Sequence, residues 1–343
     1  MAIPCQGGLP RKSFCGFGAS RFLWKRKIRG TSCDTTSHVD DQQQQAPSEK
    51  RPARILLEGR YRKFVRDLPQ TIFYCPSCKG RKGGCERCDG YGKLTKDSVQ
   101  EILARKILPA YKARRGKFHG AGREDVDVRM LGGGRPFVFE IQKPRNLIVD
   151  EEELLAAIHD YGAGRIQVTK LVAVPRRRIA ELKETHSDKI YRVLVELLEI
   201  APDSADPFEI GQTLVGRHWE VCQRTPKRVV HRRADKERIR RVEVLGVDRC
   251  RGLLEIEIRC QHGTYVKEWI SGDDGRSQPA LSELLGCTAR CVALDVLEIL
   301  GPFPDSAPGL APLFEESLSW PLPQALSPDR WNLESISEIA RRV

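Results

Sequence analysis

Alternation of polar and apolar side chains marks the strands that the sequence predicts. Three polar residues, Asp125, Asp127 and Arg129, alternate with apolar neighbours, as in a strand with one solvent-exposed face. Similar alternation, or a short apolar run, occurs at three other places. The segments that we expect to form strands are residues 125–130, 166–174, 242–258 with a turn at 248–252, and 292–299.

Apolar residues at helical spacing predict a helix between residues 97 and 111. Asp97 and Ser98 are suitable N-caps, and Pro109 should bend the helix or end it early. Another helix should open at the acidic run after Asp150, because carboxylates favour a helix N-terminus. The further helices that we expect are residues 150–162 and 279–285.

Two arguments disagree over residues 189–195. The spacing of Ile190, Val193 and Leu194 favours a helix, whereas the β-branched residues favour a strand. The pattern alone leaves both interpretations open.

Composition divides the chain into a folded part and two tails. Residues 1–33 carry basic residues and no acid, and four consecutive glutamines follow at 42–45, so we expect residues 1–50 to be a disordered basic and polar tail. The same composition fits an organelle transit peptide or an over-extended start of the reading frame. Residues 51–300 should form the folded domain, and repeated prolines predict an extended tail at 301–343.

Positive charge is the strongest overall signal. The chain has 343 residues, a net charge of +12 and a pI near 9.2, which favour nucleic acid as a partner and a lipid surface as the second choice. Residues 223–241 hold nine lysines and arginines against two acids. Such density predicts contact with phosphates, the alternative being a solvated charged face. The basic residues that we expect to bind RNA in this segment are Arg224, Lys227, Arg228, Arg232 and Arg233.

A second basic segment lies near the start of the folded part. Arg60, Arg62 and Lys63 are interleaved with Tyr61 and Phe64, a composition that can hold phosphates and bases together. A solvated strand edge has the same composition. We predict RNA binding by the three basic residues.

The cysteines point to a metal site in a reducing compartment. Of twelve cysteines, four form two Cys-x-x-Cys pairs six residues apart, Cys75 with Cys78 and Cys85 with Cys88. Four thiolates suit a closed, structural zinc site, which would staple an insertion at residues 72–96. The short spacer leaves free thiols or a redox pair as the alternative.

The sequence shows neither a membrane-spanning segment nor a secretory signal. It has no run of eighteen apolar residues and no apolar core near its start of the kind that a secretory signal needs. We therefore expect a cytoplasmic protein.

Candidate chemistry gathers just before residue 125. Gly120 and Gly122 predict a turn that delivers Arg123, Glu124 and Asp125 to the mouth of a strand. An acid beside an arginine suits catalysis. A surface hairpin whose charges only keep the protein in solution would look the same.

This stretch resembles the active-site segment of the pseudouridine synthases, specifically the archaeal and eukaryotic family that modifies positions 54 and 55 of the tRNA TΨC arm. The resemblance covers residues 55–300 and rests on four separated motifs. It implies that Asp125 is the essential aspartate and that residues 189–195 form a strand. Tyr191, which lies on this strand, would stack on the target base. The motif at Gly263–Gly272 implies that Lys267 pairs with Asp125 and that Tyr265 borders the substrate.

The resemblance also implies a fold and a reaction. The fold would be α+β, a mixed and mostly antiparallel sheet with flanking helices and the four-cysteine zinc insertion. The reaction would isomerise uridine at position 55, and at 54 as a second target, with an aspartate nucleophile and no redox cofactor. Arg123 or His119 would fill the space that the flipped base vacates. The partner would be tRNA, and we expect no obligate protein partner.

Two observations keep other functions in view. Family members usually carry a large RNA-binding domain before the catalytic one, and residues 1–50 are too few to form it. A non-catalytic zinc-containing RNA-binding protein would share the basic segment and the cysteines, but it leaves the Arg123–Asp125 turn unexplained. An RNA methyltransferase is disfavoured, because Gly132–Gly134 is a weak match to a cofactor loop.

Overall fold

The computed structural model describes residues 52–231 and 233–301. The tail expected at residues 1–50 and all but the first residue of the tail expected at 301–343 lie outside the described residues, as does Arg232. Within the described part, no helix is long and apolar enough to cross a lipid bilayer.

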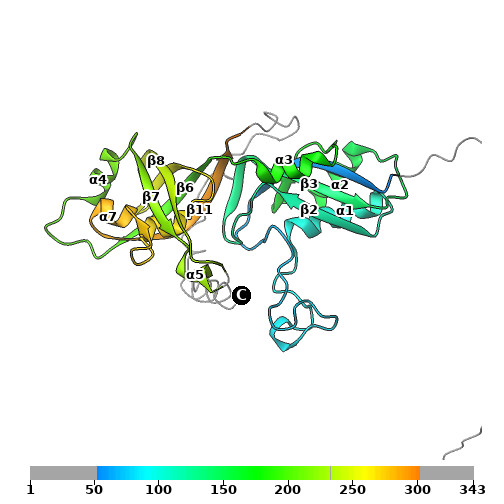
Figure 1. Cartoon of the computed structure of the whole chain (residues 1–343), viewed down its shortest axis with the longest axis horizontal. Helices are drawn as coiled ribbons and strands as arrows, with labels where there is room; N and C mark the ends of the chain where they lie inside the picture. Colours follow the sequence, from blue (N-terminus) through cyan, green and yellow to red (C-terminus); the bar gives the residue numbers. More distant parts are fainter. Residues whose placement is uncertain (1–51, 232, 302–343) are drawn as a thin grey trace, which may run out of the picture. The chain divides into compact units, whose positions relative to one another are not determined.

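A large sheet organises the described part (Figure 1). Its strand order is β10-β7-β8-β9-β6-β11-β3-β1-β4, with β2 paired to β3 and β5 to β1. Neighbouring strands run antiparallel, except that β11 and β3 are parallel where Asp295 faces Arg129. The strands are β1 (Arg54–Lys63), β2 (Arg115–Gly120), β3 (Arg129–Gln142), β4 (Ile166–Val168), β5 (Val172–Ala173), β6 (Lys189–Leu198), β7 (His218–Arg224), β8 (Glu237–Cys250), β9 (Leu253–Cys260), β10 (Ser277–Gln278) and β11 (Thr288–Ile299).

Helices cover the sheet in two groups. α1 packs on α2, and α3 packs on β2 and β3, whereas α4 and α7 pack on each other beside β8 and β11 (Figure 1). The mixed, mostly antiparallel α+β fold with flanking helices is thereby confirmed. The helices are α1 (Val99–Ala110), α2 (Glu151–Tyr161), α3 (Arg177–Glu184), α4 (Pro207–Thr213), α5 (Lys227–Val230), α6 (Val266–Ser271), α7 (Leu281–Leu285) and the 3₁₀ turn η1 (Glu86–Cys88).

Periodicity explains which faces are buried. On β9 the alternating Leu254, Ile256 and Ile258 are at most 2% exposed, as the predicted hairpin requires. On α1 the apolar residues at helical spacing are fully buried, and Ser98 accepts a hydrogen bond from the Glu101 amide at 3.2 Å. The predicted helices at 97–111 and 150–162 are confirmed in type and position.

Some predicted elements differ from the structure. Residues 125–128 form a turn, closed by a hydrogen bond from the Val128 amide to the Asp125 carbonyl (3.2 Å), and the strand starts only at Arg129. Asp125 is exposed as expected, but the prediction of an exposed side chain is wrong for Arg129, which is 7% exposed and pairs with Asp295. The single strand expected at 166–174 is two short strands, β4 and β5. Residues 189–195 lie in a strand, β6, as the resemblance implied.

Candidate functional site

A fully buried lysine holds the turn that carries Asp125. Lys63, at the end of β1, donates from Nζ to the carbonyls of Leu68 (2.8 Å), Asp125 (3.2 Å) and Val126 (2.9 Å). Burial lowers the pKa of Lys63 to about 8, partly offset by the charges of nearby acids. The backbone of the turn is therefore fixed from inside the protein.

The Glu124 side chain points into the protein interior, unlike that of Asp125. Its carboxylate accepts a hydrogen bond from the Tyr61 hydroxyl (2.6 Å) and lies 2.6 Å from Nε of Arg135, and both charged side chains are at most 2% exposed. Burial opposes ionisation, but Arg135 and Lys63 hold the pKa of Glu124 below its ordinary value. Glu124 thus locks the turn onto β1 and β3.

Asp125 points outward and lies between two cations. Its side chain is 47% exposed, and Oδ2 lies 3.5 Å from a guanidinium nitrogen of Arg228 and 3.7 Å from Nζ of Lys267. The structure thus brings together Asp125 and Lys267, as the resemblance implied. Lys267 makes its shorter contact elsewhere, a hydrogen bond of 2.6 Å to Asp127.

Lys267 and Asp127 stabilise each other's charge. Burial disfavours the charged form of Lys267, yet Asp127 and Asp125 raise its pKa above the ordinary value. Burial likewise opposes ionisation of Asp127, and the charge and hydrogen bond of Lys267 lower its pKa. The ammonium group beside Asp125 is therefore held in place and charged.

Sequence reasoning missed the second cation at Asp125. Arg228 was assigned to RNA, but α5 brings it to the turn, where its Nε also donates to Glu268 of α6 at 2.6 Å. Nothing in the sequence links residues 125, 228 and 268. Their meeting depends on how α5 and α6 pack, which no local pattern encodes.

Tyr191 lies on β6 in register with Ile258 and Val296 and is partly buried. Burial raises the pKa of its hydroxyl well above the usual value, and the negative charges of nearby Asp125 and Glu124 raise it further. The ring is thus a neutral aromatic group within the electrostatic reach of Asp125.

The other predicted substrate contacts are placed differently. Arg123 is exposed on the turn beside Asp125. Tyr265 precedes α6, and its hydroxyl accepts a hydrogen bond from Arg233 at 3.2 Å. His119 of β2 contacts Glu140 of β3 at 3.2 Å, so the structure engages it in the sheet.

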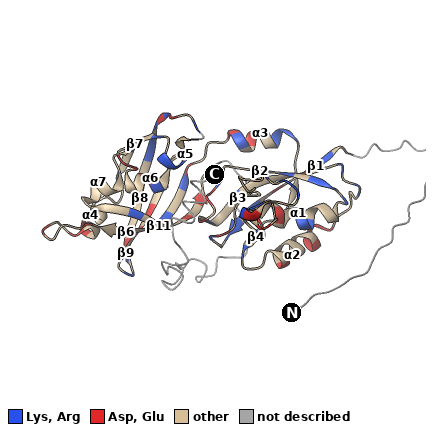
Figure 2. Ribbon diagram, turned by 90° about the horizontal axis from the view of Figure 1, so that it is seen from below, with Lys and Arg blue, Asp and Glu red and all other residues tan. Residues whose placement is uncertain are grey.

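The predicted RNA-binding residues separate into two sets. Basic residues lie along β7, β8 and α5 (Figure 2), where Arg224 and Lys227 are more than half exposed and pair with Asp235 and Asp274. Arg233 is exposed as well. The second set consists of three basic residues of β1 that are buried or partly buried, Arg60, Arg62 and Lys63.

This second set requires a correction. Lys63 is fully buried and Arg62 is 7% exposed, with its Nε donating to the Gly132 carbonyl at 2.6 Å. Arg60 donates to the carbonyls of Gly133 (2.6 Å) and Gly134 (2.9 Å). The prediction failed because β1 is an interior strand. Arg60 and Arg62 satisfy the bulged backbone of β3, and Lys63 satisfies the backbone of the turn that carries Asp125. We no longer expect them to contact RNA directly.

The four clustered cysteines fit a tetrahedral metal. Their Sγ atoms all lie within 4.8 Å of one another, and three neighbouring pairs are 3.7 to 3.8 Å apart. Zn–S bonds of about 2.3 Å place ligand sulfurs about 3.8 Å apart in a tetrahedron. The amides of Cys85 and Gly92 point at Sγ of Cys88, at 3.2 and 3.1 Å, which favours a thiolate there. This donor set can hold a metal such as zinc.

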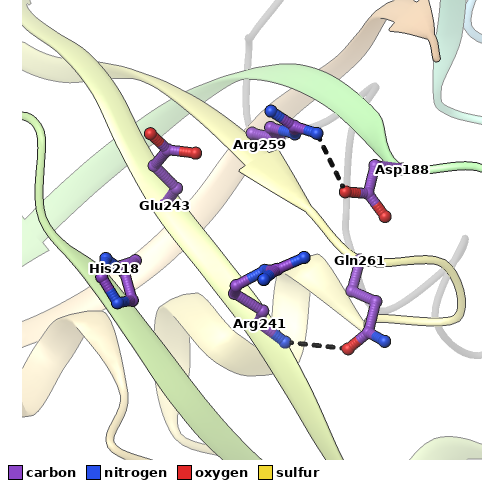
Figure 3. A pocket seen from close by; sticks show the side chains of 6 residues that line it. All are labelled: Asp188, His218, Arg241, Glu243, Arg259 and Gln261. Carbon is purple, nitrogen blue, oxygen red and sulfur yellow. Dashed lines mark hydrogen bonds and ion pairs between the residues drawn. The ribbon is translucent and has the colours of Figure 1, made fainter.

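A separate hollow of about 320 Å³ lies over the sheet (Figure 3). Its lining carries both signs of charge. Arg259 donates to Asp188 at 3.3 Å, and the backbone amide of Arg241 donates to the Gln261 side chain at 3.2 Å. None of the predicted catalytic or substrate residues lines it. The residues around the hollow are Asp188, His218, Arg241, Glu243, Arg259 and Gln261.

Known proteins resemble most of the folded part. The chain is 46% identical over 250 residues to "tRNA pseudouridine synthase Pus10" of Methanothermobacter marburgensis, covering 72% of this chain and 60% of that one. It is 44% identical over 246 residues to the protein of that name from Methanocaldococcus jannaschii, covering 71% and 53%. The chain therefore spans between about half and three fifths of the length of these relatives.

A comparison with solved structures finds a protein in the crystal structure of a Cbf5-Nop10-Gar1 complex, with a TM-score of 0.33 and 18% identity, over 61% of this chain and 46% of that one. The family model described as "Pus10, C-terminal" matches residues 56–300, which is more than half of the chain. The chain belongs to this Pus10 C-terminal family.

Proposed function

We propose that this chain isomerises uridine to pseudouridine in tRNA, with Asp125 as the nucleophile. The observation that carries the proposal is the half-exposed Asp125 carboxylate, which faces Lys267 and Arg228 at the end of a rigid turn. The relatives' printed name, tRNA pseudouridine synthase, supports the same reaction. We further propose position 55 of the TΨC arm as the target, with position 54 as a second one.

The reaction breaks the glycosidic bond, turns the base and joins its carbon to the sugar. An ionised carboxylate can attack and later leave, so that no electrons are gained or lost overall. Lys267 and Arg228 lie beside the Asp125 carboxylate and would orient it. Because a paired base is out of reach, the uridine must leave the RNA stack. Tyr191 would stack on the flipped base and Arg123 would fill the space left behind.

The surface around α5 would bind the RNA backbone. Arg224, Lys227 and Arg233 are exposed there and can exchange their present partners for phosphates. Each phosphate contact adds to the salt dependence of binding. We therefore expect tRNA affinity to fall steeply as salt concentration rises.

The test uses unmodified tRNA transcripts, with pseudouridine mapped by position. Transcripts that carry cytidine in place of U54 or U55 separate the two targets. The native protein should modify U55, whereas Asp125→Asn should bind the same transcript and modify nothing. If native protein and variant bind equally and no uridine changes, the proposed reaction is wrong, and an RNA-binding protein without activity becomes the better description.

We also propose that the four cysteines hold a structural zinc ion. The purified protein should contain close to one zinc per chain, and Cys78→Ser should lose it, because removing a ligand opens a closed site. Elemental analysis measures this directly. Zinc-free native protein with an unchanged proton NMR spectrum would contradict the proposal. The alternative of free thiols would then remain.

A further inference from the structure

The cysteine hairpin (residues 72–96) presents aromatic rings to solvent. Tyr91 is 78% exposed and Tyr74 is 56% exposed, although aromatic side chains are usually largely buried. The two cysteine pairs already form the small core of this hairpin. The stability of the hairpin therefore does not explain why the ring of Tyr91 lies outside.

The same hairpin is strongly basic. Residues 72–96 contain six lysines and arginines and two acids. This excess of four positive charges outweighs the two negative charges that a divalent metal with four thiolates would add. The basic side chains that are exposed are Lys79, Arg81, Lys82, Arg87 and Lys96.

The backbone around Tyr91 is held in one conformation. Gly90 (φ 81°) and Gly92 (φ 73°) flank it in the left-handed region, where a side chain would cause strain. The Cys75 amide donates to the Gly92 carbonyl at 2.9 Å, and the Tyr91 amide donates to the Cys88 carbonyl at 2.8 Å. The ring is thus presented outward by an ordered loop.

The base of the hairpin is tied to the candidate active site. Gln70, just before the hairpin, donates to the Gly122 carbonyl of the Asp125 turn at 3.0 Å. At the other end, Lys93 contacts Glu101 of α1 at 2.5 Å. Tyr74 follows Gln70 by four positions, and even a fully extended chain of that length spans only about 14 Å. The base of the hairpin therefore lies beside the turn that carries Asp125.

We propose that this hairpin is a second RNA contact, with the Tyr91 ring as a stacking platform for an unpaired base and Lys79, Arg81 and Lys82 as phosphate contacts. The proposal rests on the proposed function for the identity of the RNA. A ring next to several cations fits RNA because every base has a face for stacking and every nucleotide carries a phosphate. The metal would act by holding these side chains in place.

The experiment measures equilibrium binding of an unmodified tRNA transcript to the full chain. Tyr91→Ala should weaken binding roughly fivefold or more, and Tyr91→Phe should restore it, since stacking needs only the ring. Lys79→Gln, Arg81→Gln and Lys82→Gln together should lower the slope of log K against log salt by about 2 to 3. The matched control removes three charges from α3 and its N-cap residue, namely Arg176→Gln, Arg177→Gln and Lys183→Gln.

Zinc content checks that each variant keeps its hairpin, and a transcript with 4-thiouridine in the TΨC arm gives a direct reading by crosslinking to native protein. Crosslinks within residues 72–96 support the proposal. Unchanged affinity of Tyr91→Ala together with crosslinks only elsewhere overturns it, as does an equal loss in the α3 control. Hairpin-dependent binding by a protein that makes no pseudouridine would instead refute the proposed function alone.

Discussion

Asp295 and Asp125 each face more than one cation, but Asp295 is buried and Asp125 is half exposed. Asp295 on β11 is fully buried, and its carboxylate accepts hydrogen bonds from Arg66 (2.5 Å), Arg129 (2.9 and 2.6 Å) and Arg192 (3.1 Å). These contacts join β11 to β3 in the parallel pair where Asp295 faces Arg129. Every oxygen is saturated, so this carboxylate has no capacity left for a substrate.

Asp125 is arranged in the reverse way. Its two cations stay at 3.5 and 3.7 Å and make their shorter contacts to Glu268 and Asp127. The acid is thus close to positive charge, only loosely bound by it, and 47% exposed. The number of neighbouring cations therefore does not identify a reactive acid. What distinguishes Asp125 is the combination of neighbouring charge with incomplete hydrogen bonding and access from solvent.

The largest effect should come from Asp125→Asn. The amide keeps the shape but cannot act as a nucleophile, so we expect the single-turnover rate of pseudouridine formation to fall on the order of 10⁴-fold or more. The free energy of unfolding should change by less than about 1 kcal/mol, because half-exposed ion pairs contribute little. Urea titration beside the rate measurement checks both. A strongly destabilised variant would place Asp125 with Asp295 as a structural acid.

Asp295→Asn should show the opposite behaviour. Removing one partner of a buried ionic cluster leaves Arg66, Arg129 and Arg192 without their shared counter-charge, which costs about 3 to 5 kcal/mol of unfolding free energy. The matched control is Asp274→Asn, which breaks the exposed pair with Lys227 and should cost less than about 1 kcal/mol. Equal losses in the two variants would show that burial is not what separates them.

The sequence could predict features that repeat locally along the chain, but not contacts between residues that are far apart in the sequence. Periodicity located α1, α2 and the β8–β9 hairpin, because a buried face repeats along the chain. It misjudged Arg129, which alternates like a solvent-exposed residue, since its partner Asp295 is 166 residues away. One signal was present: Asp295 is a charged residue within an apolar run, and such a residue requires a partner when buried.

The residues of the candidate site also differ in how far the sequence could predict them. The proximity of Asp125 and Lys267 was expected because the resemblance to a family supplies pairs that local patterns do not, and the catalytic roles of Asp125, Tyr191 and Lys267 stay predictions. Arg228 and Glu268 were missed because α5 and α6 meet only in three dimensions. Arg60 and Lys63 were misassigned because composition cannot distinguish a basic strand that is buried from one that is exposed.

Acid should weaken the Asp295 cluster in a defined window. Burial opposes ionisation of Asp295, but the hydrogen bond from Arg129 and the charge of Arg66 hold its pKa below the ordinary value. A carboxyl with a lowered folded-state pKa stabilises fully above its unfolded pKa of about 3.9, and this contribution is lost as pH falls through the folded value. Unfolding free energies of native protein and Asp295→Asn should therefore converge below about pH 4. A gap that stays constant between pH 7 and pH 3 would contradict this explanation.

The smallest effect tests whether geometry matters at Asp125 in addition to charge. Arg228 reaches Asp125 and Glu268 with different nitrogens of one planar group, and a lysine keeps the charge but cannot span both. Arg228→Lys should therefore lower the single-turnover rate about tenfold while tRNA affinity stays within about twofold, because the phosphate-binding charge remains. Lys227→Arg, the exposed neighbour on α5, is the control and should change neither quantity. If Arg228→Lys keeps the native rate, the guanidinium acts on Asp125 through charge alone, and the orientation of Asp125 must come from Lys63 and the turn itself.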